Sequence, residues 1–452
     1  MKKIFPQLFN VKRNEVAPVL LAVAFFFCVL TALMILRPAR EALGLQSGIE
    51  SVRWLFVGTA VITLLVNPLF GLLVSRLRRL YFIIATYLFF GASLVIFYLI
   101  MVLAPDVIGV TTGQVFYVWY SVFNLFVTMV FWALMADRFS YDQGKRLFGL
   151  IAVGGTCGAI FGPWLSSMLA KPLGTPALLL VSAGFLLLAL AACWAVTRTG
   201  TDRALGGSAA GVARASAQEE QEPIGGSAWQ GVRAVIRSRY LLGIASYVVI
   251  VAIMATMIYF TRLQMVAALD EGLDQRTAMF ARIDLITQAV TLLLQAVVAG
   301  HLMKRLGVSV TLVLLPLTAA LGFVGLALVG SLAVLIALES AFRAVQRALM
   351  RPARETLFTV VGREDKYKAK AFIDTFVYRG GDVMGAQLEG LLGRLGMGMA
   401  AIVSVVVPLA LVWAALGFWL GRVQQRMALT ESAPLQTTES QGTETITTRN
   451  SQ

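Results

Sequence analysis

Twelve long apolar runs limit the folds that this chain of 452 residues can adopt. A helix needs about 20 mostly apolar residues to cross the hydrocarbon core of a bilayer. Runs of about that length occur near residues 17–36, 54–74, 81–103, 115–135, 147–170, 176–196, 241–260, 283–303, 308–329, 332–350, 371–393 and 400–420. Because lipid tails offer no hydrogen-bond partners, such segments satisfy their own backbone groups as helices. We therefore predict an all-α integral membrane protein with twelve transmembrane helices.

Charge content and charge placement support this interpretation. Only 14% of the residues are charged, whereas soluble domains carry about 25%. With a cytoplasmic N-terminus, the cytoplasmic segments would hold 27 of the 38 Lys and Arg residues and the outer loops would hold 8. Positive residues concentrate on the cytoplasmic side of membrane proteins, so we expect both termini there. The net charge of +14 then reflects topology and does not indicate nucleic-acid binding.

Several classes of function lack their sequence signals. The single histidine, His301, excludes a multi-histidine metal site, and the three cysteines lie inside apolar runs. No Gly-Lys-Ser/Thr phosphate-binding loop is present, so an ATP-driven pump would need a separate subunit. We expect neither such an ATPase subunit nor a bound cofactor. We expect no enzyme activity, because no motif supplies a nucleophile or an acidic metal site. The expected protein is a monomer whose partners are the lipid bilayer and a small solute.

Two interruptions divide the chain into parts. Residues 198–228 combine small residues with an acidic cluster, which is typical of a flexible linker. The following segment, Trp229 to Arg239, mixes apolar and basic residues as helices at a membrane surface do. We predict an N-terminal six-helix bundle over 1–197, a cytoplasmic linker with an interfacial helix over 198–240, a C-terminal six-helix bundle over 241–421 and a disordered tail over 422–452.

The two bundles share short patterns at a nearly constant offset. The pair Gly154-xxx-Gly158 in the fifth run matches Gly381-xxx-Gly385 in the eleventh, 227 residues later. Small residues spaced in this way let two membrane helices pack closely. The match predicts that a six-helix unit has been duplicated, which gives two pseudo-symmetric bundles.

The pentapeptide Arg-Pro-Ala-Arg-Glu occurs twice, at 37–41 and at 351–355, each time near the end of an apolar run. Arginine costs about 2.5 to 3.5 kcal/mol at the centre of a membrane helix on insertion scales. Arginines in such runs therefore indicate a water-filled path through the membrane. Pro38 would bend or end the first helix. Whether the second copy lies inside the tenth helix or in the loop after it stays open.

The tenth run carries charged residues at four-residue intervals, so they share one face of a helix. Glu339, Arg343 and Arg347 form this stripe, and Arg351 continues it. In one interpretation the stripe lines a solute path. In another, Glu339 neutralises Arg343 within the helix and the later arginines anchor its end.

Polar residues on other runs extend the candidate site. Its candidate substrate-binding residues are Arg37, Arg40, Asn124, Gln288, Arg343, Arg347, Arg351, Arg354 and Arg379. Its candidate coupling or charge-balancing residues are Asp284, Glu339, Asp374 and Asp382. The arginines outnumber the carboxylates, and guanidinium groups bind phosphate and carboxylate through two parallel hydrogen bonds. We therefore expect an anionic cargo, and several arginines favour a phosphorylated one.

Two family resemblances sharpen this expectation. Gly300 to Gly307 resembles the loop signature Gly-x-Leu-x-x-Arg-x-Gly of the major facilitator superfamily. The segments Leu36 to Arg40, Asp142 to Gly149, Arg351 to Glu355 and Lys366 to Asp382 resemble bacterial members of the ATP/ADP antiporter family. The resemblance implies a major facilitator fold, alternating access and exchange of nucleotides. Those exchangers carry membrane-embedded lysines where this chain has arginines.

We accordingly expect a secondary transporter in the bacterial inner membrane that exchanges an anionic, phosphorylated or nucleotide-like solute. Two alternatives remain open. One is a proton-coupled transporter of another small organic anion, and the other is a membrane sensor or partner protein that moves no cargo.

Overall fold

The computed structural model describes residues 11–12, 15–76, 79–198, 228–298, 302–396 and 399–431. Within these ranges every regular element is a helix, which confirms the predicted all-α fold. Most of the predicted linker and tail, residues 199–227 and 432–452, lies outside the described residues.

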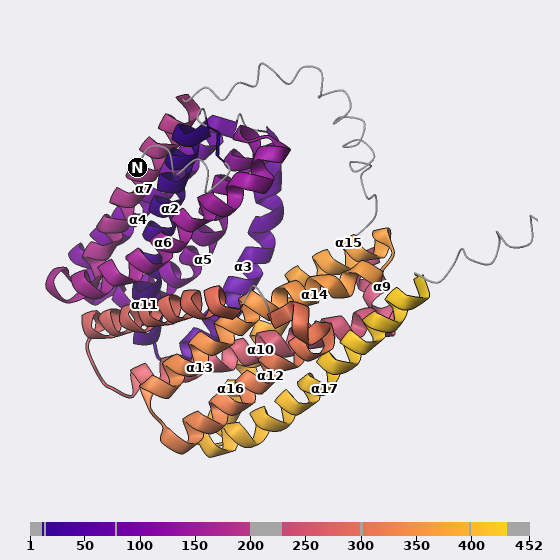
Figure 1. Cartoon of the computed structure of the whole chain (residues 1–452). Helices are drawn as coiled ribbons and strands as arrows, with labels where there is room; N and C mark the ends of the chain where they lie inside the picture. Colours follow the sequence, from indigo (N-terminus) through magenta and orange to yellow (C-terminus); the bar gives the residue numbers. More distant parts are fainter. Residues whose placement is uncertain are drawn as a thin grey trace, which may run out of the picture.

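Six long helices form the N-terminal half (Figure 1). They are α2 (Val16–Gln46), α3 (Ile49–Arg76), α4 (Arg79–Leu103), α5 (Pro105–Arg138), α6 (Tyr141–Leu173) and α7 (Thr175–Arg198). Phe25, Phe123 and Phe131 are fully buried among them and belong to one hydrophobic core. Aromatic side chains of this size fill the space between helices that cross at an angle.

The C-terminal half begins with the short helix α9 (Ala228–Arg237), which lies where an interfacial helix was predicted. Three long helices follow: α10 (Arg239–Ala267), α11 (Leu273–Val298) and α12 (Leu302–Val329). The remaining elements are α13 (Leu332–Val345), η3 (Gln346–Met350), α14 (Arg351–Leu357), η4 (Phe358–Val360), α15 (Arg363–Phe372), η5 (Ile373–Val377), α16 (Tyr378–Arg394) and α17 (Met399–Glu431).

Ten helices of the described part of the chain are long and apolar enough to cross a membrane. Two further helical segments, α13 to α14 and α15 to α16, complete the twelve. Each of the two contains a single π-helical turn, η3 or η5, between its α-helical parts. These are the tenth and eleventh predicted spans, whose charged residues lower their hydropathy.

Two helix ends differ from what the apolar runs suggest. The tenth segment does not end near residue 350, because α14 continues it from Arg351 to Leu357 and places Arg351 and Arg354 on a helix. Helix α2 runs through Pro38 to Gln46, so the proline does not end it. A hydropathy profile places a helix end where charged residues follow an apolar run. Here the helices continue, and charged residues such as Arg37 and Arg354 form ion pairs with other helical elements.

The paired glycines mark the same packing in both halves. A Cβ atom on Gly154 of α6 would lie 2.3 Å from the backbone oxygen of Val23 on α2. A Cβ atom on Gly381 of α16 would lie 2.9 Å from the backbone oxygen of Val249 on α10. Both distances are too short for a side chain, so glycine is required where these helices cross. The structure thus confirms that the glycine pairs serve close helix packing.

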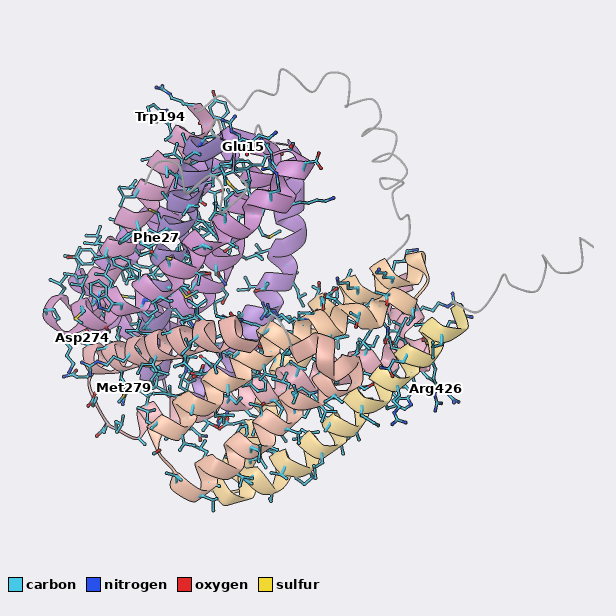
Figure 2. All side chains as sticks on the ribbon, viewed as in Figure 1. Glu15, Phe27, Trp194, Asp274, Met279 and Arg426 are labelled. Atoms are coloured by element: carbon cyan, nitrogen blue, oxygen red, sulfur yellow. The ribbon has the colours of Figure 1, made fainter. Side chains whose placement is uncertain are left out.

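The two halves approach each other at one end of the molecule and diverge from there (Figure 1). Helix α11 lies along α6 and α2, and α16 lies along α3. The connections after α2, α6 and α10 and the end of α16 are at this end, which we call the closed end. Figure 2 shows Asp274, at the start of α11, near the closed end and Glu15, before α2, far from it.

Candidate functional site

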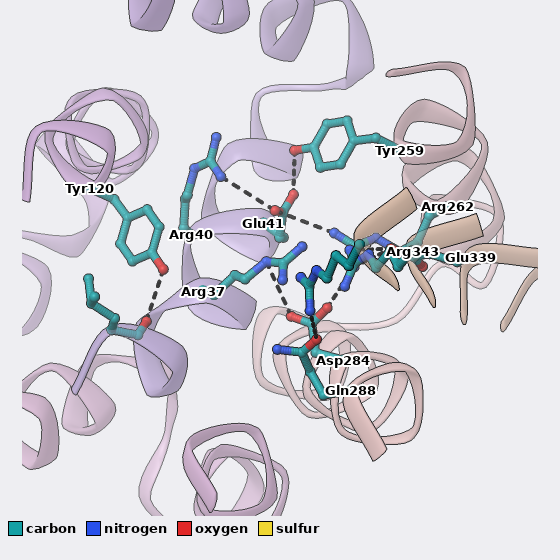
Figure 3. Close-up of polar contacts among 12 residues, drawn as sticks. Arg37, Arg40, Glu41, Tyr120, Tyr259, Arg262, Asp284, Gln288, Glu339 and Arg343 are labelled. Atoms are coloured by element: carbon teal, nitrogen blue, oxygen red, sulfur yellow. Dashed lines mark hydrogen bonds and ion pairs between the residues drawn. The ribbon is translucent and has the colours of Figure 1, made fainter. Parts of the chain in front are cut away.

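A buried charge cluster joins the two halves near the closed end (Figure 3). Its centre is Arg262 of α10, whose side chain is 0% exposed. Nη1 of Arg262 lies 2.9 Å from Oδ1 of Asp284 and 3.6 Å from Oε1 of Glu339. Nη2 lies 3.4 Å from Oε1 of Glu41, which belongs to α2 in the other half. Buried charges are costly unless they are paired, so one arginine holds carboxylates from three other helices together.

Three more arginines surround this centre. Nε of Arg37 lies 3.6 Å from Oδ2 of Asp284, and this ion pair also crosses between the halves. Arg343 donates a hydrogen bond to Glu339 one helical turn away. Arg40 stacks over the ring of Tyr117 at 3.8 Å and lies 3.6 Å from Glu41. With Arg262, four arginines face three carboxylates, so the cluster carries excess positive charge.

Tyrosines close the cluster on the side of Glu41. The hydroxyl of Tyr259 on α10 donates a hydrogen bond to Glu41 and lies 2.8 Å from the hydroxyl of Tyr117 on α5. Phe56 of α3 packs against the ring of Tyr259 with 5.1 Å between ring centroids. All these contacts cross between the halves, and they exclude water from the carboxylate of Glu41.

A second set of polar contacts links α3 and α16 at the closed end. Nε of Arg53 donates a 2.9 Å hydrogen bond to Oε2 of the buried Glu389. Gln264 of α10 also donates to Glu389. The exposed Glu50 pairs both with the exposed Arg394 and with the buried Arg53. These contacts hold the closed end together independently of the central cluster.

Beyond the cluster, the arginine stripe continues without carboxylate partners. Arg347 is exposed, and its Nη1 lies 3.4 Å from the side-chain oxygen of Gln288 on α11. Arg351, one turn further, is also exposed. No carboxylate among the described residues lies within ion-pair distance of Arg347 or Arg351. Asn124 of α5 is likewise exposed in the other half.

The remaining predicted site residues lie apart from the cluster, within the C-terminal half. Nη1 of Arg354 lies 2.9 Å from Oδ1 of Asp374. Nη1 of Arg379 lies 3.3 Å from Oδ2 of Asp382, which also accepts a 3.4 Å hydrogen bond from Thr256. The structure therefore divides the predicted residues into the buried cluster, the exposed residues beyond it and these two ion pairs of the C-terminal half. Glu339 does pair with Arg343, as one interpretation of the stripe expected, but it contacts Arg262 as well.

The centre of the cluster is not among the site residues that the sequence predicts. The seventh apolar run ends near residue 260, so the sequence alone assigns Arg262 to an outer loop. The structure corrects this, because Arg262 lies inside α10 and is fully buried. Glu41 was noticed only as part of the pentapeptide. The spacing of Tyr259 and Arg262 could have indicated this. The two residues are three apart, so a helix that continued past residue 260 would place them on the same face.

No group of three or more His, Cys, Asp or Glu side chains that could hold a metal ion occurs in the described part of the chain. Each carboxylate of the cluster lies near the positive charge of Arg262, which disfavours binding of a cation there.

The chain thus has two groups of membrane-length helical segments that meet through a buried charge cluster. The family profile of the Major Facilitator Superfamily matches residues 19–345. The chain therefore belongs to the Major Facilitator Superfamily and is a multi-pass membrane protein, a secondary transporter of that type.

Solved structures share this fold at low sequence identity. The nucleoside transporter NupG aligns with a TM-score of 0.60 and 10% identity, over 91% of this chain and 99% of that one. A D-xylose–proton symporter aligns with a TM-score of 0.56 and 14% identity, over 90% and 97%. A bacterial homologue of the iron transporter ferroportin in an inward-facing state aligns with a TM-score of 0.62 and 10% identity, over 91% and 100%. No curated protein sequence matches this chain significantly.

Proposed function

We propose that this protein exchanges an anionic, phosphorylated or nucleotide-like solute across the membrane. The observation that carries the proposal is the arginine stripe on η3 and α14. Arg347 and Arg351 are exposed and lack carboxylate partners among the described residues, although they belong to a membrane-spanning segment. Unpaired cations in such a position need a counter-charge that the protein does not supply.

Arg347 is best placed to hold the anion. It lies beside Gln288, and Arg351 follows it one helical turn along the same segment. An oxyanion bound here would supply the counter-charge that Arg347 lacks. Arg37 belongs to the N-terminal half and Arg347 to the C-terminal half, so one anion that bound both would link the halves.

The charges also favour exchange over uniport. When the empty carrier changes its conformation, arginines without counter-ions lose hydrating water and form no ion pair that offsets the loss. This desolvation raises the free-energy barrier to the conformational change of the empty carrier. A bound anion removes this cost in both directions. Proton coupling is less well supported, because Asp284 and Glu339, the membrane carboxylates nearest the stripe, are both held by Arg262.

The placement of positive residues supports an orientation in the membrane. The start of α2 and the end of α17 lie away from the closed end. With both termini in the cytoplasm, the closed end faces outward, and the arginine stripe is approached from the cytoplasm. The proposed location is the bacterial inner membrane.

Uptake by proteoliposomes tests the role of Arg347. We expect Arg347→Ala to lower uptake of a labelled phosphate ester by about 10- to 100-fold, since hydrogen bonds to charged groups contribute about 1.5–3 kcal/mol. Arg347→Lys should keep part of the activity, because it keeps the charge but loses the paired hydrogen bonds. Arg282→Ala removes an exposed arginine of α11 and serves as the control. Wild-type uptake by Arg347→Ala would contradict the assignment.

A further inference from the structure

A cavity of the C-terminal half is lined by residues of α10, η3, α14, η5 and α16. Its volume is about 470 Å³, and two buried valines of α10 form its apolar wall. Its polar lining consists of Gln346, Arg351, Arg354, Glu355, Asp374 and Tyr378. A pocket with an apolar wall and a few converging polar groups is the usual form of a small-molecule site.

Both π-helical turns of the structure contribute to this cavity. Gln346 comes from η3 and Asp374 from η5, and the two turns interrupt neighbouring transmembrane segments. Single π-turns are rare, and they occur frequently at functional sites. Two π-turns that line one cavity therefore suggest a binding site and not a packing defect.

The cavity is lined by two arginines and two carboxylates, but both carboxylates lie near the same arginine. Arg354 pairs with Asp374 at 2.9 Å and approaches Glu355 at 3.4 Å, but its Nε is buried without a hydrogen-bond partner. Glu355 is shared, because it also accepts a hydrogen bond from Lys370. Arg351 lines the same cavity and has no carboxylate within ion-pair distance among the described residues. A guanidinium without a carboxylate partner, beside a second arginine in one cavity, is the kind of group that an oxyanion would satisfy.

We infer that this cavity is a further anion site beside the transport site and that it binds a phosphate group through Arg351 and Arg354. The phosphate pairs with Arg351, which has no carboxylate partner among the described residues, and competes with Asp374 for the guanidinium of Arg354. Arg351 lies four residues after Arg347, about 6 Å along the helix axis. The cavity is therefore one helical turn from the proposed transport site and can deliver an anion to it.

The ligand class rests on the proposed function, but the site can be tested by itself. The test measures binding of inorganic phosphate by calorimetry to the full-length protein in dodecylmaltoside, a detergent without phosphate. An Arg347→Ala background weakens the transport site, so the binding that remains reports the cavity. We expect Arg351→Gln in this background to weaken phosphate binding at least tenfold.

Asp374→Asn provides the decisive variant because it should act in the opposite direction. Removing the competing carboxylate releases Arg354, so phosphate should bind several-fold more tightly. Asp270→Asn, which changes an exposed carboxylate of the loop after α10, should leave the affinity unchanged. Weaker or unchanged binding by folded Asp374→Asn protein would overturn the inference.

The outcomes separate this site from the transport site. Complete loss of phosphate binding in Arg347→Ala protein would reject the cavity site while leaving the proposed function intact. Binding that depends on Arg351, together with wild-type transport by Arg347→Ala, would support the cavity and reject the proposed function. Addition of a short-chain phosphatidylglycerol identifies the source of the phosphate group. Competition would assign the site to a lipid headgroup, and no competition would assign it to a soluble anion.

Discussion

The two copies of Arg-Pro-Ala-Arg-Glu have the same five residues and opposite surroundings. The first copy, at the end of α2, belongs to the cluster between the halves, and its Glu41 side chain is only 1% exposed. The second copy, in α14, lines a cavity within one half, and its Glu355 side chain is 46% exposed. Glu41 contacts Arg262 and Tyr259 of the other half, whereas Glu355 contacts residues of its own half.

This difference shows that the position in the fold, and not the local sequence, decides what the motif does. At the closed end each arginine of the first copy lies near a carboxylate, Arg37 near Asp284 and Arg40 near Glu41. In α14 both neighbouring carboxylates lie near Arg354, so Arg351 has no carboxylate partner among the described residues. The first copy therefore serves to hold the halves together, and the second is available for an anion.

The largest effect should come from removing the centre of the cluster. Arg262→Met leaves Glu41, Asp284 and Glu339 buried with fewer partners, and breaking a buried ion pair costs about 3–5 kcal/mol. We expect the free energy of unfolding, measured in mixed detergent micelles, to fall by that amount. Arg282→Met is the matched control on the exposed face of α11. A loss below about 1 kcal/mol would show that Arg262 does not hold the cluster together.

The same substitution in the two copies tests the comparison directly. Glu41→Gln should lower the free energy of unfolding by about 1.5–3 kcal/mol, because hydrogen bonds to a buried charge are lost. Glu355→Gln should lower it by less than about 1 kcal/mol, because that carboxylate is exposed. Unfolding curves of both variants under one condition provide the measurement. Equal losses would mean that the two environments do not differ in energy as the contacts suggest.

A smaller difference is expected between two arginines that join α3 and α16. Arg53→Gln leaves the buried Glu389 with Gln264 as its remaining partner, which should cost about 1–2 kcal/mol of unfolding free energy. Arg394→Gln removes an exposed ion pair with Glu50 and should have no measurable effect. If Arg394→Gln lowered the free energy of unfolding more than Arg53→Gln, exposed ion pairs, and not the buried Arg53–Glu389 pair, would stabilise the closed end.

The smallest effect concerns Glu15, which pairs within one half and far from the closed end. Burial raises the pKa of Glu15, but hydrogen bonds from Gln143 and from the backbone of Lys12, with the charge of Arg146, outweigh burial and lower it. A lowered pKa stabilises the fold above the unfolded value of about 4.3, and this contribution is lost as the pH falls below it. We expect the stability difference between wild type and Glu15→Gln to shrink from pH 7 to pH 3.5. A difference that grows on acidification would contradict this.

The sequence predicted the general fold well because membrane-length apolar runs leave few alternatives. It also placed Arg37, Asp284, Glu339 and Arg343 together in one candidate site, and the structure holds them in one cluster as two ion pairs joined by Arg262. It did not find Arg262, because a charged residue at the edge of an apolar run looks like the end of a helix. Nor could it pair Arg354 with Asp374, since that contact depends on how α14 and η5 face each other.

Counterflow in proteoliposomes tests the central claim most directly. Liposomes are loaded with ATP, ADP or phosphate, labelled ATP is added outside, and uptake is followed with time. The account predicts uptake that needs an internal anion and that disappears in Arg343→Ala and Arg347→Ala protein. Uptake equal to that of empty, protein-free liposomes for every phosphorylated anion tried, from protein shown to be folded, would contradict the claim that the arginine stripe carries a phosphorylated solute.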